Sequence, residues 1–297
     1  MVRVNTRSDI RDFLISRRAR ISPEQAGLPA FGYGARRRVQ GLRREEVAML
    51  AGISAEYYIR LERGNAGGVS DEVLDAIARA LQLDEAERAH LFDLVRTVTT
   101  SAPARRRPSQ ERVRPVVQRV LDSMLTVPAY VRNGRLDILA ANRLGAALYS
   151  PVFSTQAEIP NMARFIFLDP QATEFFAGWE GIASDAVAIL RAEAGRHPYD
   201  RRLSGLIGEL STRSEEFRVR WAAHNVKFHR TGAKQLHHPV VGDLTLSYEA
   251  LELPADSGQR ILVYTAEPNS PSDDALKLLA TWCATTPIAE SRADAAR

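Results

Sequence analysis

The sequence predicts an α+β protein, in which an all-α domain of five short helices precedes a domain with an antiparallel sheet and packed helices. Apolar residues recur at helical spacing over residues 1–96, whereas hairpin and strand patterns appear only after residue 110. Between them, residues 97–109 lack an apolar period and are rich in small, proline and basic residues, as linkers are. We therefore expect domains over 1–96 and 110–285, and a flexible tail over 286–297.

Each of the five expected helices has its own pattern. The first has one apolar face, formed by Ile10, Phe13, Leu14 and Ile21. The other four adjoin residues that commonly cap or end helices. They are expected over 43–51 before Gly52, over 55–63 after Ser54, after Ser70, and after the capping-box pair Asp84 and Glu87.

The second domain is expected to begin with a helix marked by Val116, Val120 and Met124. Asn133-Gly134, a strong hairpin pattern, then lies between expected strands at 130–131 and 136–139. Further helices are expected over 142–149, 172–194, 201–210, 215–224 and 273–283, and further strands over 226–229, 235–238, 244–253 and 261–265. This order, with two strands, then helices, then three or four strands, predicts an antiparallel sheet covered by helices.

Charge is distributed unevenly along the chain. Through Arg114 there are 21 basic residues, all arginine, and 15 acidic ones, whereas the remainder has 19 basic and 21 acidic residues. A GC-rich genome accounts for much of the preference for arginine over lysine, but not for the uneven net charge. The excess of arginine in the first domain indicates a polyanionic partner, because the guanidinium binds phosphate through paired hydrogen bonds.

Other totals exclude several classes of protein. The single cysteine, Cys283, excludes an internal disulfide framework. No apolar run reaches the length of a membrane helix, and the N-terminus lacks the apolar stretch of a signal peptide. We therefore expect a cytoplasmic protein with no membrane partner.

Residues 43–64, RREEVAMLAGISAEYYIRLERG, have the pattern of a helix-turn-helix. Apolar side chains fall where two helices would press together, at Val47, Leu50, Ile53, Tyr58 and Leu61. Gly52 can adopt the positive φ of the tight turn between them. The second helix of such a unit lies in the major groove of DNA, with its N-terminal side chains at the base edges. The alternative, an ordinary helical hairpin with a solvated basic face, explains fewer of these features.

Two groups of residues are expected to contact DNA. Those facing the base edges are Ser54, Ala55, Glu56, Tyr57 and Arg60. Arg60 can donate to guanine O6 and N7, Glu56 can accept from cytosine N4 or instead orient Arg60, and Tyr57 can contact a thymine methyl group or a phosphate. Phosphate contacts, which position a protein without specifying sequence, are expected from Arg36, Arg37, Arg38, Arg43 and Arg44.

These motifs resemble a known family. GLRREEVAMLAGISAEYYIRLERG, followed by VLDAIARALQLDEAERAHLFDL, resembles the XRE (lambda-repressor-like) helix-turn-helix family in the version found in MmyB-like regulators of actinobacteria. PAYVRNGRLDILAAN, LSTRSEEFRVRWAAHNVKFHRTG and HHPVVGDLTLSYEALELP resemble the ligand-binding domain of the same family. The resemblance covers nearly the whole chain. It implies a transcriptional regulator with a PAS-like C-terminal domain that binds an apolar small molecule such as a fatty acid.

The sequence departs from the family pattern at two places. Many relatives carry a basic, proline-bearing loop after the recognition helix, where this chain has Asn65-Ala66-Gly67-Gly68-Val69. This difference removes phosphate contacts. The usual His-Asp-Val after the tryptophan is His224-Asn225-Val226 here, so any role of that carboxylate in the family is absent.

A pocket for an apolar ligand needs a few converging polar groups. The candidates are Asn142, Arg143, Tyr149, Trp221, His224 and Lys234. An arginine or histidine could hold a carboxylate headgroup, although Asn142 can instead cap a helix and Arg143 can face solvent. His237 and His238 fall on opposite faces of a strand, and we interpret the histidines as structural or surface residues. No spacing indicates a metal site, a catalytic residue or a cofactor.

The sequence leaves three candidate functions. The leading one is a ligand-responsive transcription regulator that binds a near-palindromic operator as a homodimer, as helix-turn-helix proteins match paired half-sites. The second is a constitutive DNA-binding regulator whose C-terminal domain mediates dimerisation or recruits a protein without ligand. The third, an enzyme fused to a DNA-binding domain, has no supporting motif.

Overall fold

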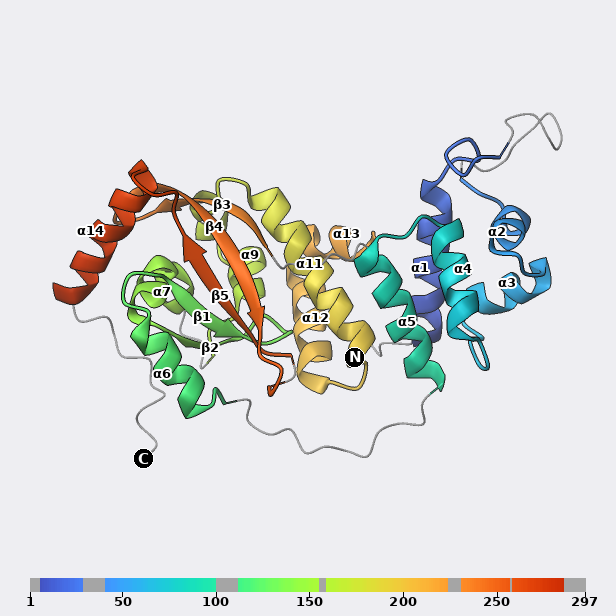
Figure 1. Ribbon diagram of the computed structural model, residues 1–297, viewed down its shortest axis with the longest axis horizontal. Helices are drawn as coiled ribbons and strands as arrows, with labels where there is room; N and C mark the ends of the chain where they lie inside the picture. The colour runs from blue at the N-terminus through green and yellow to red at the C-terminus, as the bar shows by residue number, and fades with distance from the viewer. Residues whose placement is uncertain are drawn as a thin grey trace. The chain divides into compact units, whose positions relative to one another are not determined.

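The computed structural model describes residues 6–28, 41–99, 112–154, 159–223, 231–256 and 258–285. The chain forms two compact units, one of residues 1–107 with 187–228 and the other of residues 108–186 with 229–297. The boundary at Val187 falls inside one helix, α11 (Trp179–Arg196) (Figure 1). The expected tail over 286–297 and most of the expected linker over 97–109 lie outside the described residues.

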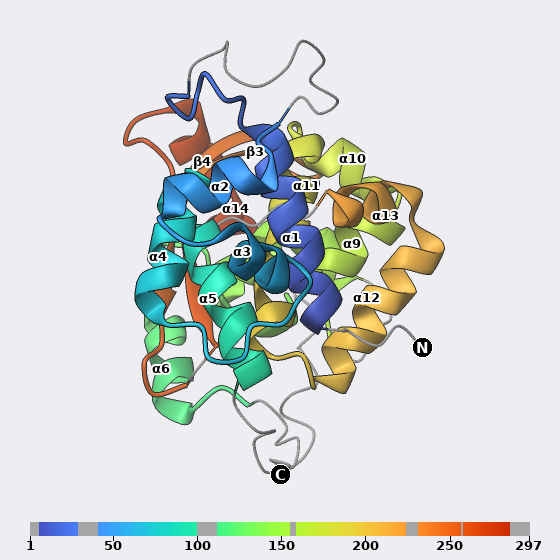
Figure 2. The same ribbon diagram turned by 90° about the vertical axis from the view of Figure 1, so that its right-hand side faces the viewer.

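Over residues 6–28 and 41–99 the first unit contains the five expected helices, which are α1 (Thr6–Arg20), α2 (Arg44–Ala51), α3 (Ala55–Glu62), α4 (Asp71–Ala80) and α5 (Glu85–Thr99) (Figure 2). Their apolar faces meet in one core, which includes Ile10, Phe13, Val47, Tyr58, Leu61, Leu74, Ile77 and Leu91. Ser54 and Ser70 cap α3 and α4 as expected, accepting hydrogen bonds from the backbone N–H groups of Tyr57 and Val73. The all-α start of the predicted fold is confirmed.

The second unit contains, in its described residues, an antiparallel sheet of five strands: β1 (Ala129–Arg132), β2 (Ile138–Ala141), β3 (Thr231–His238), β4 (Gly242–Glu252) and β5 (Arg260–Thr265). The strand order is β2-β1-β5-β4-β3 (Figure 1). Along β3, Lys234 and Leu236 are buried whereas Gln235 and His237 are exposed. The predicted α+β fold with an antiparallel sheet is thus confirmed. The strand expected over 226–229 lies outside the described residues.

The other described helices are α6 (Pro115–Ser123), α7 (Arg143–Leu148), α8 (Ser150–Phe153), α9 (Met162–Leu168), α10 (Gln171–Phe175), α11, α12 (Arg201–Arg213), α13 (Glu215–Ala222) and α14 (Pro271–Thr285). The prediction of one helix over 172–194 was wrong. The chain breaks between α10 and α11 because its backbone pairs with β3 there. Phe176 forms a β-bridge with Leu236, and the N–H of Ala177 donates to the carbonyl of Gln235 at 3.2 Å.

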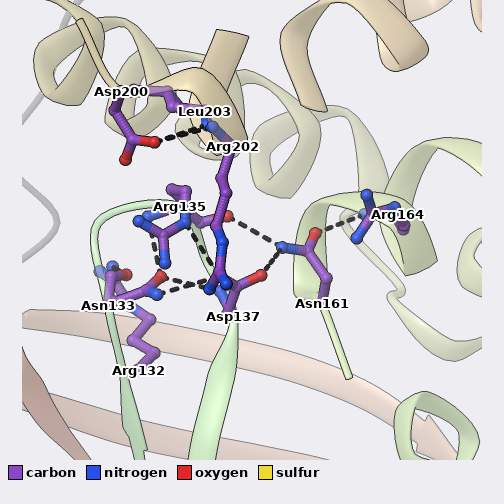
Figure 3. A network of polar contacts seen from close by, with 9 residues as sticks. All are labelled: Arg132, Asn133, Arg135, Asp137, Asn161, Arg164, Asp200, Arg202 and Leu203. Carbon is purple, nitrogen blue, oxygen red and sulfur yellow. Dashed lines mark hydrogen bonds and ion pairs between the residues drawn. The ribbon is translucent and has the colours of Figure 1, made fainter. Parts of the chain in front are cut away.

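The β1–β2 hairpin also differs from its expected form. Leu136, expected in a strand, lies in the turn with φ of 67°. The side-chain oxygen of Asn133 accepts hydrogen bonds from the backbone N–H groups of Arg135 and Asp137, at 2.9 and 3.1 Å. The amide of Asn161, which caps α9, donates to the Asp137 carboxylate at 2.7 Å (Figure 3). Side-chain hydrogen bonds therefore shape a longer turn than the Asn-Gly pair indicates, and they tie it to the start of α9.

Candidate nucleic-acid interface and ligand-binding residues

A tight left-handed turn joins α2 to α3. Gly52 ends α2 with φ of 67° and ψ of 31°, and the N–H of Ile53 donates to the carbonyl of Ala48 at 3.0 Å. Glycine suits this position because a side chain disfavours positive φ. Val47 and Tyr58 are fully buried on the facing sides of the two helices. The turn and the packing expected for a helix-turn-helix are both present.

The outward side of α3 carries the residues that the sequence assigns to base contacts. Ser54, at the start of the helix, and Glu56 and Arg60 are exposed, whereas Ala55 and Tyr57 are half-buried. The guanidinium of Arg60 lies over the ring of Tyr57, 4.7 Å from its centre. Arg60 therefore stacks on Tyr57, and in the described part of the chain it forms no ion pair with Glu56. The ring holds the guanidinium along the helix and leaves its N–H groups available to a partner.

A buried carboxylate anchors the inner end of α3. Glu62 is 2% exposed, and one of its oxygens accepts a hydrogen bond from Nε of Arg18 on α1 at 2.8 Å. The other oxygen accepts from Nε of Arg44 at the start of α2. Arg18 also donates to the carbonyl of Leu42 at 2.8 Å. Glu62 thus connects α1, α2 and α3. Sequence reasoning missed it, although an acid beside Tyr58 and Leu61 on the apolar side of α3 was a usable indication.

Of the five arginines expected to contact phosphate, two lie in the described residues. Arg44 is 46% exposed, and its ion pair with Glu62 orients its guanidinium. Glu62 also raises the pKa of Arg44 through that hydrogen bond. Arg43 is half-buried, and its backbone N–H donates to the carboxylate of Glu46 at 2.6 Å. Arg36, Arg37 and Arg38 lie outside the described residues.

Asn142 has a structural role, in which every polar atom of its side chain forms a hydrogen bond. Its amide oxygen accepts hydrogen bonds from the N–H groups of Gly145 and Ala129, at 2.7 and 3.0 Å. Its amide nitrogen donates to the carbonyls of Met124 and Val127, at 2.8 and 2.7 Å. These four bonds use the bonding capacity of the amide. Asn142 therefore caps α7, which was the alternative reading of this residue. Arg143 beside it is exposed.

Lys234 and Tyr149, by contrast, lie together among buried aromatic rings of the second unit. Nζ of Lys234 donates to the hydroxyl of Tyr264 at 3.3 Å. It also lies 5.9, 5.2 and 5.6 Å from the ring centres of Tyr149, Tyr248 and Tyr264. The hydroxyl of Tyr130 is 3.3 Å from that of Tyr264. We call these four tyrosines and Lys234 the lysine–tyrosine cluster.

Burial controls the protonation of this cluster. It lowers the pKa of Lys234 to about 7, with the nearby charge of Arg132 acting in the same direction and that of Asp185 opposing both. Burial also raises the pKa values of Tyr149 and Tyr264 well above their ordinary value. In the described part of the chain Lys234 forms no ion pair with a carboxylate. The cluster is therefore a place where a positive charge is weakly compensated and where an anion would be favoured.

Comparison with known families decides the class of protein. Residues 113–279, more than half of the chain, match the family model of the MmyB-like transcription regulator ligand binding domain. The chain belongs to the MmyB-like transcription regulators. Residues 16–91 match a helix-turn-helix domain model. No curated protein sequence matches the chain significantly.

These two matches establish a DNA-binding transcription regulator that carries a ligand-binding domain. Both matched families are regulatory rather than enzymatic. In the described residues of this MmyB-like regulator, no helix is both long and apolar enough to cross a membrane. Those residues also contain no group of three or more His, Cys, Asp or Glu side chains placed to hold a metal ion.

Two further ligand candidates of the MmyB-like regulator are Trp221 and His224. Trp221 belongs to the first unit, where it stacks on Phe217 with ring centres 5.5 Å apart. His224 lies outside the described residues. Tyr248 and Tyr264, which sequence reasoning missed, could have been found from the alternation of strands β4 and β5, which places them on the buried face.

The histidines of β3 lie as the strand period predicts. His238 is buried and its Nε2 lies 3.0 Å from the carbonyl of Ala147. His237, on the opposite face, is exposed and pairs with Asp243 at 2.5 Å. Burial lowers the pKa of His238. Both residues have local partners, in keeping with structural and surface roles.

Proposed function

We propose that this regulator reads a specific duplex DNA sequence with α3 and that an apolar molecule with an acidic group controls it from the lysine–tyrosine cluster. The observation that carries the first part is the exposed edge of α3, where Arg60 is oriented by Tyr57 and the helix is anchored behind by Glu62. A preoriented guanidinium suits bidentate donation to guanine. Arg43 and Arg44, with Arg36, Arg37 and Arg38, would supply phosphate contacts.

The second part rests on the environment of Lys234. A buried ammonium group is unfavourable unless an opposite charge or several hydrogen bonds compensate it. Lys234 is 6% exposed and has one hydrogen bond, to Tyr264, among the described residues. A carboxylate would compensate its charge, and the tyrosine rings with Leu236 and Leu246 would pack against an apolar body. A fatty acid has both features, and it is our proposed effector class.

A fatty acid and the alcohol of equal chain length form a matched pair of probes. We expect the saturated fatty acid to raise the unfolding temperature of the full chain more than its alcohol does, because only the acid can pair with Lys234. The Lys234→Met variant should abolish this difference. Lys277→Met, which alters a lysine that is 64% exposed on α14, should retain it. Equal shifts by acid and alcohol in the wild-type protein would exclude the acidic group from the proposal.

The dimer forms a separate part of the proposal. Val116 and Val120 lie one turn apart on α6 and are 52% and 43% exposed. Two adjacent apolar side chains on an exposed helix favour contact with a second copy. This observation also supports the second candidate function, a constitutive regulator whose C-terminal domain dimerises without ligand. Sedimentation of the protein on a duplex with paired sites, for the wild type and Val116→Lys, tests it. One protein chain per duplex would overturn the homodimer.

A further inference from the structure

Two positions on helix α1 contact the C-terminal end of the recognition helix α3. Near the C-terminal end of α1, Arg18 holds the buried carboxylate of Glu62. Near the N-terminal end, the backbone of Arg7 lies directly against Gly64, just beyond α3, where any side chain would overlap the Arg7 carbonyl. Gly64 also has φ of 83°. The two helices are thus in contact where α3 ends. A movement of α1 would therefore be transmitted to α3.

The last part of α11, from Val187 onward, belongs to the same unit as α1. Arg191 is 4% exposed there, although it is an arginine. Its guanidinium lies 4.1 Å from the ring centre of Trp221 on α13 and donates to the Trp221 carbonyl. The charges that attract it are the carboxylates of Asp9 and Asp12 on α1. Arg191 thus contacts α13 directly and interacts with α1 through charge.

Helix α5 packs against the same turns of α11. A side chain at Gly195 would lie 2.8 Å from the ring of His90, so the glycine allows the two helices to approach closely. The hydroxyl of Thr97 donates to the carbonyl of Gly195 at 3.2 Å. Asp93 and Arg196 form an ion pair at 3.8 Å. The α11 contact therefore combines shape complementarity with a hydrogen bond and an ion pair, and the ring of His90 also packs against Phe13 of α1, with ring centres 5.2 Å apart.

We propose that α1 is a relay, which transmits a movement of α11 to the recognition helix. Asp9 and Arg191 couple α1 to α11. Arg18, Glu62 and Gly64 couple α1 to α3. Helix α11 belongs to the segment that matches the ligand-binding domain, whereas α3 belongs to the segment that matches the helix-turn-helix domain. The relay depends on the proposed function in one respect, which is the identity of the effector that would move α11. The coupling itself is a property of the chain and can be measured without an effector.

Coupling between two sites is reciprocal, so DNA bound at α3 must alter α11. A duplex selected from random-sequence DNA by the full-length wild-type protein serves as the probe. We expect saturation with this duplex to change the hydrogen exchange of backbone amides over 187–196. We also expect Asp9→Asn and Arg191→Met each to change the dissociation constant for the duplex by about fivefold or more. The double variant should show no more change than the larger single effect, because both residues serve one electrostatic interaction.

Arg213→Met is the matched control for Arg191→Met, because Arg213 lies on α12, is 59% exposed and pairs with Glu209 one turn away. It should leave the dissociation constant unchanged. Asp9→Asn keeps the shape of the side chain, so it guards against loss of folding in the arginine variant. Wild-type affinity in a folded Asp9→Asn protein, together with unchanged exchange over 187–196, would overturn the relay. Failure of the wild-type protein to select any duplex would instead overturn the proposed function.

Discussion

Glu62 at the end of α3 accepts a hydrogen bond of 2.8 Å from Arg18, a residue of α1 that lies 44 positions earlier in the chain. The contact is nearly closed to solvent, because Glu62 is 2% exposed and Arg18 is 14% exposed. It fixes the inner end of α3, whereas Arg60 and Tyr57 lie on the outer side.

Removal of this carboxylate should destabilise the first unit. Glu62→Ala leaves the buried side of Arg18 without its partner, and loss of one member of a buried pair lowers the free energy of unfolding by about 3 kcal/mol. Denaturation in urea measures the change. Glu56→Ala is the control on the same helix. Because Glu56 is exposed, its replacement should change stability by less than about 0.5 kcal/mol. Similar losses in both variants would mean that the Glu62 contact is not important for stability.

Arg60 should carry sequence specificity rather than general affinity. Arg60→Ala should weaken binding to a selected duplex by about 1–3 kcal/mol and binding to random DNA very little. Fluorescence anisotropy titrations on the two duplexes measure the difference. Arg43→Ala should weaken both to a similar extent and reduce the salt dependence of binding, as expected for a phosphate contact. Equal losses on both duplexes in Arg60→Ala would assign Arg60 to phosphate.

Two glycines with positive φ near α3 should respond differently to the same substitution. A side chain at Gly52 meets no atom within 4 Å, so Gly52→Ala introduces only the backbone strain, about 1–2 kcal/mol. Gly64→Ala adds a clash with the backbone of Arg7, which cannot yield without moving α1. Thermal unfolding should show the larger loss in Gly64→Ala. The reverse order would show that α1 adjusts freely to the end of α3.

Lys234 should make stability depend on pH. Burial lowers its pKa in the folded protein to about 7, below its value in the unfolded chain. The unfolded chain therefore binds the proton more tightly, and stability increases as pH rises from about 7 towards the unfolded pKa of about 10.4. Below the folded pKa Lys234 is charged in both states, and the full cost of burying its charge lowers the free energy of unfolding. We expect Lys234→Met to stabilise the protein most at and below about pH 7, and progressively less as the pH rises towards about 10.4. A pH-independent difference between the two proteins would contradict this.

Local chemistry determined most of what could be predicted. Gly52 and Ser54 act on neighbours within a few residues, so the turn and the cap between α2 and α3 followed from the sequence alone. The period of α3 placed Arg60 outward and Leu61 inward. The strand period likewise separated His237 from His238. In each case the determining partner is nearby in the chain.

Features that depend on distant partners were missed. The backbone at Phe176 leaves the helix to pair with Leu236 on β3. The sequence around Phe176 contains no pattern that indicates this break in the helix. Tyr264 reaches Lys234 across the sheet, so the lysine–tyrosine cluster exists only after the strands have paired. Asn142 was assigned to a ligand, but its four hydrogen bonds join α7 to the backbone before β1 and at its start. Such roles arise from the tertiary fold.

The contact between α5 and α11 has a consequence for synthesis on the ribosome. Helix α5 ends at Thr99, and the part of α11 that shares its unit begins at Val187. Nearly 90 residues must be made in between, which takes on the order of 5–20 s at the usual rate of synthesis. During this time the five N-terminal helices present an uncovered surface. That surface carries Asp9, Asp12 and Asp93. Carboxylates that water solvates well would protect the nascent chain from aggregation until α11 has been made.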